Sequence, residues 1–398
     1  MHNGEKKVLS WFTKHIAIIC LVVMMFLIVC LYISIGFNVD ITAVSADFNS
    51  FLQPWWNEII HHGHFHALAH QIGNYNIAYQ TLLAWLTTWH ISCQNALKIV
   101  GGITNFVLAL LVGGFTYHLK NKQHWFDFVI PCLVTLILPP VFLNGMIWLQ
   151  CDALYTLFII GALWCFYYDH WSWGMFIYGI SLAFKLQAIM LLPFIIIMYL
   201  MQRKHSVANL LLILVGFYLP NMAGLFYGRA WDAPFLIYIN QSNDYHDLAI
   251  NAINLNQLLR SDNVLNYQVM QPLMIIITIL IFAIVVIFLI NYHFNFKQNY
   301  ISLAAWVMWT CYLFLPAMHE RYDFSIGILL LIASCISIKY LPVFMSLMVI
   351  DSIVYCNYLF NTGENAAVLS LLMIIIYSID TYLLFGKAIK NNLMQLDE

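Results

Sequence analysis

Four polar clusters interrupt a chain that is otherwise strongly apolar, and their residue types indicate one kind of chemistry. They lie around Asp47 and in the segments 144–152, 185–187 and 319–322. Ionisable groups beside hydrocarbon are costly, so they commonly have a function. A carboxylate such as that of Asp47 can accept a proton from an attacking hydroxyl group, and basic side chains can grip a phosphate. The clusters therefore favour transfer of a group from a phosphate-linked donor to a hydroxyl.

In this interpretation the base is Asp47, and the phosphate ligands are Lys185, His319 and Arg321. Each cluster also has a simpler interpretation. Lys185 could extend through apolar surroundings and place its ammonium group at the membrane interface. Asp47 could be an ordinary loop acid or a helix cap, and 319–321 could be a solvated loop. The observation that favours function is that acids and bases converge on one side of a chain with few charges.

The composition indicates a membrane protein. Of 398 residues, 63% are hydrophobic and only 9% are charged, whereas soluble domains carry about 25% charged residues. The mean hydropathy is +0.81, and no soluble fold of this length could bury so much apolar surface. The net charge of −2 comes without a basic tract, so we expect no nucleic acid partner. Most of the nine cysteines lie in apolar runs, and only Cys93 and Cys151 are placed to form a disulfide, which we regard as the less favoured alternative.

The apolar runs predict an all-α polytopic integral membrane protein with about 12 transmembrane helices. Lys6, Lys7 and Lys14 precede a first run that is too long for a signal peptide, and they place the N-terminus in the cytoplasm. The short apolar segment 77–89 is predicted to lie at the interface instead of spanning. The predicted spans are about 15–37, 97–118, 126–143, 153–168, 171–188, 190–201, 208–227, 268–290, 300–316, 324–338, 341–360 and 367–385.

This organisation makes residues 1–398 a single membrane domain with two long outer loops. The first loop, 38–96, is expected to carry interfacial helices, and the second, 228–267, is polar and rich in Asn and Asp. The basic turns and the C-terminus fall in the cytoplasm, in agreement with the positive-inside rule. All four polar clusters then lie at the outer face.

The first outer loop also contains a group of closely spaced histidines, namely His61, His62, His64, His66 and His70. Such residues can bind zinc, but this spacing fits no closed structural site and no cysteine accompanies it. We therefore interpret the group as part of a surface segment.

Three short motifs together resemble a known superfamily. They are Asn-x-x-x-Trp-x-Gln-Cys-Asp-Ala at 144–153, Phe-Lys-x-Gln-Ala at 184–188 and Met-His-Glu-Arg-Tyr at 318–322. The set is similar to that of the GT-C superfamily of membrane glycosyltransferases, and more closely to the bacterial branch related to the GPI-anchor mannosyltransferases. Asp47 in the first outer loop and Asn-Ala-Ile-Asn-Leu at 251–255 fit the same pattern, so the resemblance spans roughly residues 40–325.

The resemblance implies a GT-C fold, a polyprenyl-phosphate-linked sugar donor within the membrane lipid, and a glycan, glycolipid or protein acceptor on the outer face. It implies transfer of a hexose, with mannose favoured, and inversion at the anomeric carbon. Asp47 would be the catalytic base, and Lys185, His319 and Arg321 would hold the donor phosphate. The residues expected to orient substrates or ligands are Asn144, Gln150, Asp152, Gln187, Glu320 and Tyr322.

Some enzymes of this superfamily use a divalent cation, and the resemblance allows Asp47 and Asp152 to share one Mg²⁺ or Mn²⁺ ion. The expected location is a bacterial plasma membrane, with the active site on the outer face. One departure concerns Leu149, because family members usually have glycine before the residue that corresponds to Gln150. A bulkier side chain there is expected to narrow or reshape the pocket.

Two other functions stay open at this point, a lipid-linked glycan transporter and a non-catalytic glycan assembly factor. A polymerase that extends a glycan is a further variant of the transferase. A transporter needs polar residues along the centres of its helices, whereas most polar residues of this chain lie at the outer helix ends. An assembly factor is expected to lack the base, but Asp47 is present.

Overall fold

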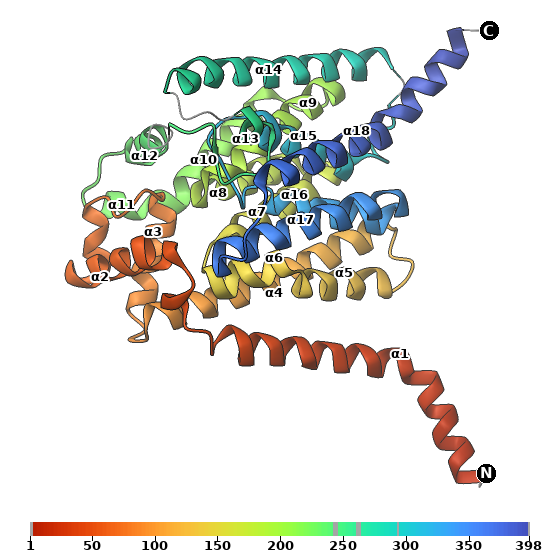
Figure 1. Cartoon of the computed structure of the whole chain (residues 1–398), viewed down its shortest axis with the longest axis horizontal. Helices are drawn as coiled ribbons and strands as arrows, with labels where there is room; N and C mark the ends of the chain where they lie inside the picture. Colours follow the sequence, from red (N-terminus) through yellow and green to blue (C-terminus); the bar gives the residue numbers. More distant parts are fainter. Residues whose placement is uncertain (1–2, 242–245, 260–263, 293, 397–398) are drawn as a thin grey trace.

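The computed structural model describes residues 3–241, 246–259, 264–292 and 294–396 of the chain. Most of these residues lie in helices, and the two strands are two residues long each (Figure 1). The predicted all-α class is therefore confirmed for the part of the chain that the structure describes.

Five helical segments are long and apolar enough to cross a membrane, and a sixth candidate is a helix pair bent by 61°. The bend falls at Leu138, which precedes Pro139 and Pro140, because proline disfavours the helical conformation of the residue before it. The helices that contain these segments are α1 (Asn3–Leu31) with the π-helical turn η1 (Tyr32–Gly36), α4 (Cys93–Leu119), α14 (Val264–Asn291), η8 (Ile338–Tyr340) with α17 (Leu341–Phe360), α18 (Ala366–Leu396), and the bent pair α5 (Phe126–Ile137) and α6 (Pro139–Phe142) with η5 (Leu143–Trp148). The chain thus has the helices of a membrane protein.

Six more helices correspond to predicted spans but are only 11 to 16 residues long. A straight span needs about 20 residues, so the count of about 12 spans stays a prediction. These shorter helices are α7 (Asp152–Tyr167), α8 (Trp171–Phe184), α9 (Leu192–Gln202), α10 (Leu211–Asn221), α15 (Tyr300–Phe314) and α16 (Phe324–Ile336), with the 3₁₀ turns η6 (Leu186–Leu191) before α9 and η7 (Val207–Leu210) before α10.

The core of the bundle is built on α15 and α16. Every residue from Tyr300 to Leu313 is buried, and so is every residue from Phe324 to Ser334. A helix that is apolar all round must have neighbours on every side. By contrast, α1 and α14 expose many large apolar side chains, as expected of helices that face lipid.

Short elements at one end of the bundle form the two long loops (Figure 1). The segment 77–89 contains a helix, α3, which packs against α8 and α10 and is too short to be a span candidate. Its position at the membrane interface stays a prediction. The elements of the first loop are η2 (Ile41–Ala43), η3 (Phe48–Leu52), α2 (Gln53–His61), η4 (His64–Ala69) and α3 (Ile77–Thr87). Those after α10 are α11 (Ala223–Phe226), α12 (Ala233–Gln241), β1 (Ala249–Ile250) and α13 (Leu255–Leu259). The predicted loop 228–267 also includes 242–245 and 260–263, which lie outside the described residues.

Two of the helix boundaries that differ from the predicted ones lie near the polar clusters. α4 begins at Cys93 instead of about 97, because the Ser92 side chain accepts a hydrogen bond from the Asn95 N–H and caps the helix. α8 ends at Phe184 instead of 188, and Lys185 is extended with φ −153° and ψ 132°. This break frees the Lys185 side chain from the helix face.

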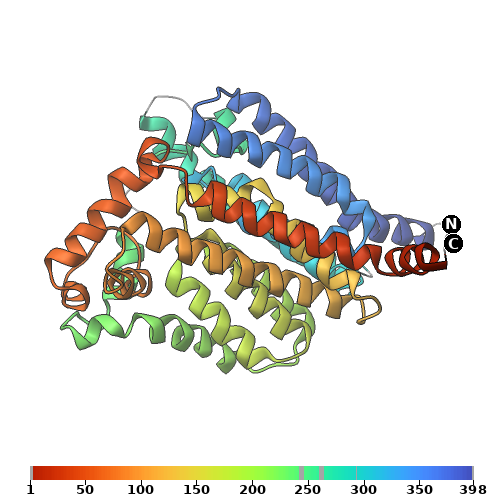
Figure 2. The same ribbon diagram turned by 90° about the horizontal axis from the view of Figure 1, so that it is seen from below.

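The two ends of the bundle differ in charge. Figures 1 and 2 show both termini at one end and α2, α3, α11 and α12 at the other. Basic residues gather around the last residues of α7: Lys297 Nζ lies 5.8 Å from the Tyr167 ring centroid, and His205 Nε2 lies 3.9 Å from Asp169 Oδ1. The first residue of α7, Asp152, is at the opposite end of that helix, within the acidic cluster described next.

Candidate active site

Asp47 lies directly before η3 and is held by three neutral hydrogen-bond donors. Trp148 Nε1 and Gln150 Nε2 donate to Oδ2 at 2.9 and 3.1 Å, and the Tyr358 hydroxyl donates to Oδ1 at 2.6 Å. Each carboxylate oxygen can accept more than one hydrogen bond. The Asp47 side chain, 18% exposed, is thus fixed in orientation and still able to accept a proton.

Two stacked aromatic rings form the platform for this carboxylate. Trp148 from η5 and Tyr358 from α17 lie with ring centroids 4.0 Å apart and ring planes 16° apart. The Arg321 guanidinium carbon lies 5.1 Å from the Trp148 ring centroid, in a cation–π arrangement. Residues more than 200 positions apart in the sequence are thereby assembled around Asp47.

The second carboxylate, Asp152, is sealed from solvent. Its Oδ1 accepts a hydrogen bond from the Lys185 ammonium in a buried ion pair, and its Oδ2 accepts one from Asn144 Nδ2 at 2.7 Å. Asn144 Nδ2 also contacts the Tyr355 hydroxyl at 3.1 Å. Lys185 is only 3% exposed, so the simpler interpretation of a lysine that reaches the interface is wrong.

Arg321 lies between the two aspartates. Its Nη1 is 3.5 Å from Asp47 Oδ2 and its Nε is 3.7 Å from Asp152 Oδ2, while Nη1 donates to Glu320 Oε1 at 2.9 Å. The guanidinium thus stands where a cation bridging the two aspartates would have to bind. No group of three or more His, Cys, Asp or Glu in the described residues is arranged to hold a metal. This arrangement does not fit the shared Mg²⁺ or Mn²⁺ ion that the sequence left open.

Burial changes the ionisation of the Met318–Tyr322 turn. Burial, together with Arg321 and Lys185, lowers the pKa of His319 to about 2. His319 is therefore neutral near pH 7 and can offer a phosphate a hydrogen bond but not a charge. Burial also raises the pKa of Glu320, while Arg321 acts in the opposite direction. The cluster brings together three carboxyl side chains (Asp47, Asp152, Glu320) and two basic ones (Lys185, Arg321).

A cavity of about 290 Å³ opens beside Asp47. Six of the predicted residues line it, namely Asp47, Gln150, His319, Glu320, Arg321 and Tyr322. An adjoining cavity of about 260 Å³ shares Gln241 and Tyr322 with it and is lined by Gln187 and by apolar side chains that include Ile189, Ile275 and Leu315. Asn144, Asp152 and Lys185 line neither cavity and stand behind Arg321.

The backbone near the cavity has an unusual conformation at Leu149. Leu149 has φ 61°, in the left-handed region that favours glycine. The glycine usual in the resembling family suits this conformation. Leu149 is buried and is not among the residues that line the cavity, so the narrowing or reshaping of the pocket by its side chain stays a prediction.

Two strands connect the second long loop to the site. β1 pairs in parallel with β2 (Met318–His319), with Ile250 opposite His319. Ile250 and Asn251 consequently line the same cavity as Arg321. This pairing fixes the turn that carries four of the predicted site residues, namely His319, Glu320, Arg321 and Tyr322.

The sequence assigned no role in the site to three tyrosines. Tyr358 binds Asp47, Tyr355 binds Asn144, and Tyr75 donates to Gln150 Oε1 at 3.1 Å. A signal for two of them was present, because Tyr355 and Tyr358 are three residues apart on an apolar helix and therefore share one face. Long-range pairing with Asp47 carries no local sequence signal.

Two minor sequence alternatives are also decided. Cys93 and Cys151 are both buried free thiols, so they form no disulfide. The histidines of the first loop make local contacts: His64 Nδ1 lies 2.8 Å from Thr87 Oγ1, and the His62 ring faces that of His70 at 5.9 Å.

Comparison of the chain with models of known protein families found no match, and comparisons with curated proteins and with solved structures found none either. The family resemblance therefore depends on the three motifs and on the site that they form.

Proposed function

We propose that the chain is a membrane glycosyltransferase of GT-C type that moves a hexose, with mannose favoured, from a polyprenyl-phosphate-sugar donor to a hydroxyl of an outer-face acceptor. The observation that carries this proposal is that Asp47 and Arg321, a fixed carboxylate and a guanidinium, line one cavity. A base and an anion ligand at the same cavity are what an inverting transfer from a phosphate needs.

In the proposed reaction the acceptor hydroxyl gives its proton to a carboxylate oxygen of Asp47. The acceptor oxygen forms a bond to the anomeric carbon as the bond from that carbon to the phosphate oxygen breaks. The electron pair of the broken bond stays on the phosphate, which gains negative charge. Arg321 stabilises that charge by moving from Glu320, 2.9 Å away, to the phosphate.

The adjoining cavity supports a lipid-linked donor. It is mainly apolar, and its wall includes Ile275 of α14, a helix that exposes many large apolar side chains. Tyr322 and Gln241 lie at the junction of the two cavities. The two cavities together suit such a donor, because its phosphate can lie beside Arg321 and its polyprenyl chain can lie in the adjoining apolar cavity.

The charge distribution supports the proposed orientation. Basic turns surround the end of α7 that is opposite Asp152, and both termini lie at that same end. By the positive-inside rule this end faces the cytoplasm. The site then faces outward, in a plasma membrane, and the six shorter helices complete about 12 crossings if the bilayer is thinned or the helices extend into short turns.

The test is sugar transfer by the purified full-length protein from a panel of radiolabelled polyprenyl-phosphate sugars. Wild type is compared with Asp47→Asn and with Asp40→Asn, a matched loss of charge at an exposed aspartate that caps η2. Loss of transfer in Asp47→Asn alone, with donor binding kept, supports the proposal. Equal transfer by all three proteins removes Asp47 from the reaction.

The alternative functions make different predictions in the same assay. A transporter of lipid-linked glycan moves label between the leaflets of a vesicle without forming a new glycosidic bond. An assembly factor does neither when purified alone. The hydrogen bonds on Asp47 favour the transferase, because neither alternative requires a carboxylate fixed at a cavity wall.

A further inference from the structure

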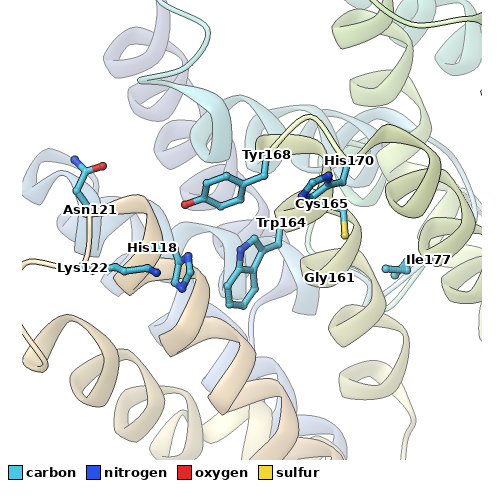
Figure 3. Close-up of a pocket in the computed structure, with 9 residues that line it drawn as sticks. All are labelled: His118, Asn121, Lys122, Gly161, Trp164, Cys165, Tyr168, His170 and Ile177. Atoms are coloured by element: carbon cyan, nitrogen blue, oxygen red, sulfur yellow. The ribbon is translucent and has the colours of Figure 1, made fainter.

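A cavity larger than the two described above lies at the other end of the bundle and belongs to no part of the proposed reaction. It measures about 730 Å³ and lies between the ends of α4, α7 and α8 (Figure 3). Trp164, in its wall, follows Asp152 by twelve residues on the same helix, which is about 18 Å along the helix axis. It is therefore distinct from the cavity beside Asp47.

The lining of this cavity is polar at one side and apolar at the other. His118, Asn121 and Lys122 lie at or just after the end of α4, and His170 precedes α8. Gly161 and Ile177 lie further into their helices; Ile177 is six residues inside α8, or about 9 Å. A single groove thus runs from the helix ends onto the apolar helix faces.

Aromatic rings fix the shape of the groove. Trp164 stacks on Phe115 with centroids 5.4 Å apart and meets the His118 ring edge-on at 5.1 Å, and Tyr168 lies edge-on to His118 at 6.0 Å. Figure 3 shows the Trp164 ring among the lining residues, with Tyr168 above it. Gly161 has no side chain to fill the space beside it. Amphipathic rings of this kind suit the boundary between headgroups and hydrocarbon.

The charge at the mouth of the groove is positive. Lys122 is exposed, extends toward His118, and makes no ion pair with any of the described residues (Figure 3). Lys120 nearby is neutralised by Asp127 at 2.6 Å. Asp169, the acid closest to His170 in the chain, faces His205 at 3.9 Å. The Lys122 ammonium is therefore a cation without an acidic partner among the described residues, beside the apolar part of the groove.

We propose that this groove binds an anionic phospholipid, with the phosphate beside Lys122 and His118 and an acyl chain between Trp164 and Ile177. Its volume lies within the range of small-ligand sites, roughly 300–1,000 Å³. A diacyl lipid with a phosphodiester head matches the groove in both respects, since its anion meets the lysine and its chain meets the apolar wall. The site is independent of the proposed transfer reaction, although in the proposed orientation it faces the inner leaflet.

The test uses Cys165, a half-buried free thiol in the groove wall. The full-length protein in detergent is labelled with N-ethylmaleimide, and the labelling rate of each cysteine is followed by peptide mass spectrometry. Phosphatidylglycerol at ten times its dissociation constant is expected to slow labelling of Cys165 about tenfold. Cys20, exposed on α1, serves as internal reference and is expected to keep its rate.

Three probes separate the possible occupants. Phosphatidylcholine, which has no net charge, is expected to protect Cys165 far less than phosphatidylglycerol, and glycerol 3-phosphate is expected not to protect it. Equal protection by phosphatidylcholine overturns the proposal in favour of a purely apolar groove. Protection by glycerol 3-phosphate overturns it in favour of a site for soluble phosphate.

Two variants complete the test. Lys122→Gln is expected to raise the phosphatidylglycerol concentration needed for protection about tenfold, through loss of one charge-assisted contact, whereas Lys6→Gln, the same charge change on exposed α1, leaves it unchanged. Gly161→Leu fills the groove next to Ile177 and is expected to remove the lipid effect with the thermal midpoint retained. Unchanged protection in both Lys122→Gln and Gly161→Leu overturns the proposal.

Discussion

Asp47 and Asp152 share one arginine but are built for opposite purposes. Asp47 faces a cavity and is held by neutral donors, with Arg321 no closer than 3.5 Å. Asp152 is fully buried and is bound directly by the Lys185 ammonium. A carboxylate at a cavity wall can meet the hydroxyl of a substrate, whereas one locked to a buried cation serves as a counter-ion. Chemistry is therefore expected of the first and stability of the second.

The largest effect is expected when Asp47 is replaced. Asp47→Asn keeps the size of the side chain but removes the base, so we expect kcat to fall by about 10²–10⁴ while the thermal midpoint stays within a few degrees of that of wild type. Single-turnover transfer and thermal unfolding in detergent measure the two quantities. A large loss of stability in Asp47→Asn would show that Asp47 also stabilises the fold. The contrast between a catalytic Asp47 and a stabilising Asp152 would then be wrong.

Asp152→Asn is expected to lower the free energy of unfolding more than it lowers the rate of transfer. It leaves the Lys185 ammonium buried without its counter-ion, which costs about 3–5 kcal/mol of unfolding free energy. The double variant Asp152→Asn with Lys185→Met removes the orphaned charge, so it should unfold at a higher temperature than the single variant. If the double variant is the less stable of the two, Lys185 has another counter-ion and the pair is not a unit.

Tyr358→Phe tests how Asp47 is oriented. Loss of the 2.6 Å hydrogen bond to Oδ1 is expected to lower kcat about tenfold, with little change in KM, because one contact of about 1.4 kcal/mol is lost. The matched control is Tyr382→Phe, which removes the hydroxyl of a side chain that is 75% exposed. An effect on KM alone would place Tyr358 in substrate binding instead.

The smallest effect concerns pH. Because burial raises the pKa of Glu320, this carboxyl becomes protonated above the pH at which an exposed glutamate would. Protonation releases Arg321 for the donor phosphate, so donor affinity should increase as the pH falls through that pKa, by at most about tenfold per pH unit. Glu320→Gln should bind tightly at all pH values, and Glu58→Gln should behave as wild type. A pH dependence that survives in Glu320→Gln would assign the titration to another group.

Composition and periodicity predicted the helical class because the bilayer imposes one chemical constraint on long stretches of chain. The polar clusters that the sequence brought together do surround one pair of cavities, with Lys185, Asn144 and Asp152 behind the walls. The charge state of His319 could not be predicted, because it depends on burial and on neighbours distant in the chain. Tyr358 was missed for the same reason, since its partner is 311 residues away.

The π-helical turn at Leu143–Trp148 has a consequence for comparisons between chains. Just after this turn the backbone N–H of Gln150 donates a hydrogen bond to the Asn144 carbonyl at 2.9 Å, across six residues instead of four. The segment therefore contains more residues than a regular helix of the same length would. Removing one residue would rotate everything after it by about 100° and turn Trp148 away from Asp47. Length is thus constrained here as strictly as side-chain identity, and we expect relatives that keep the site to align through 143–150 without a gap.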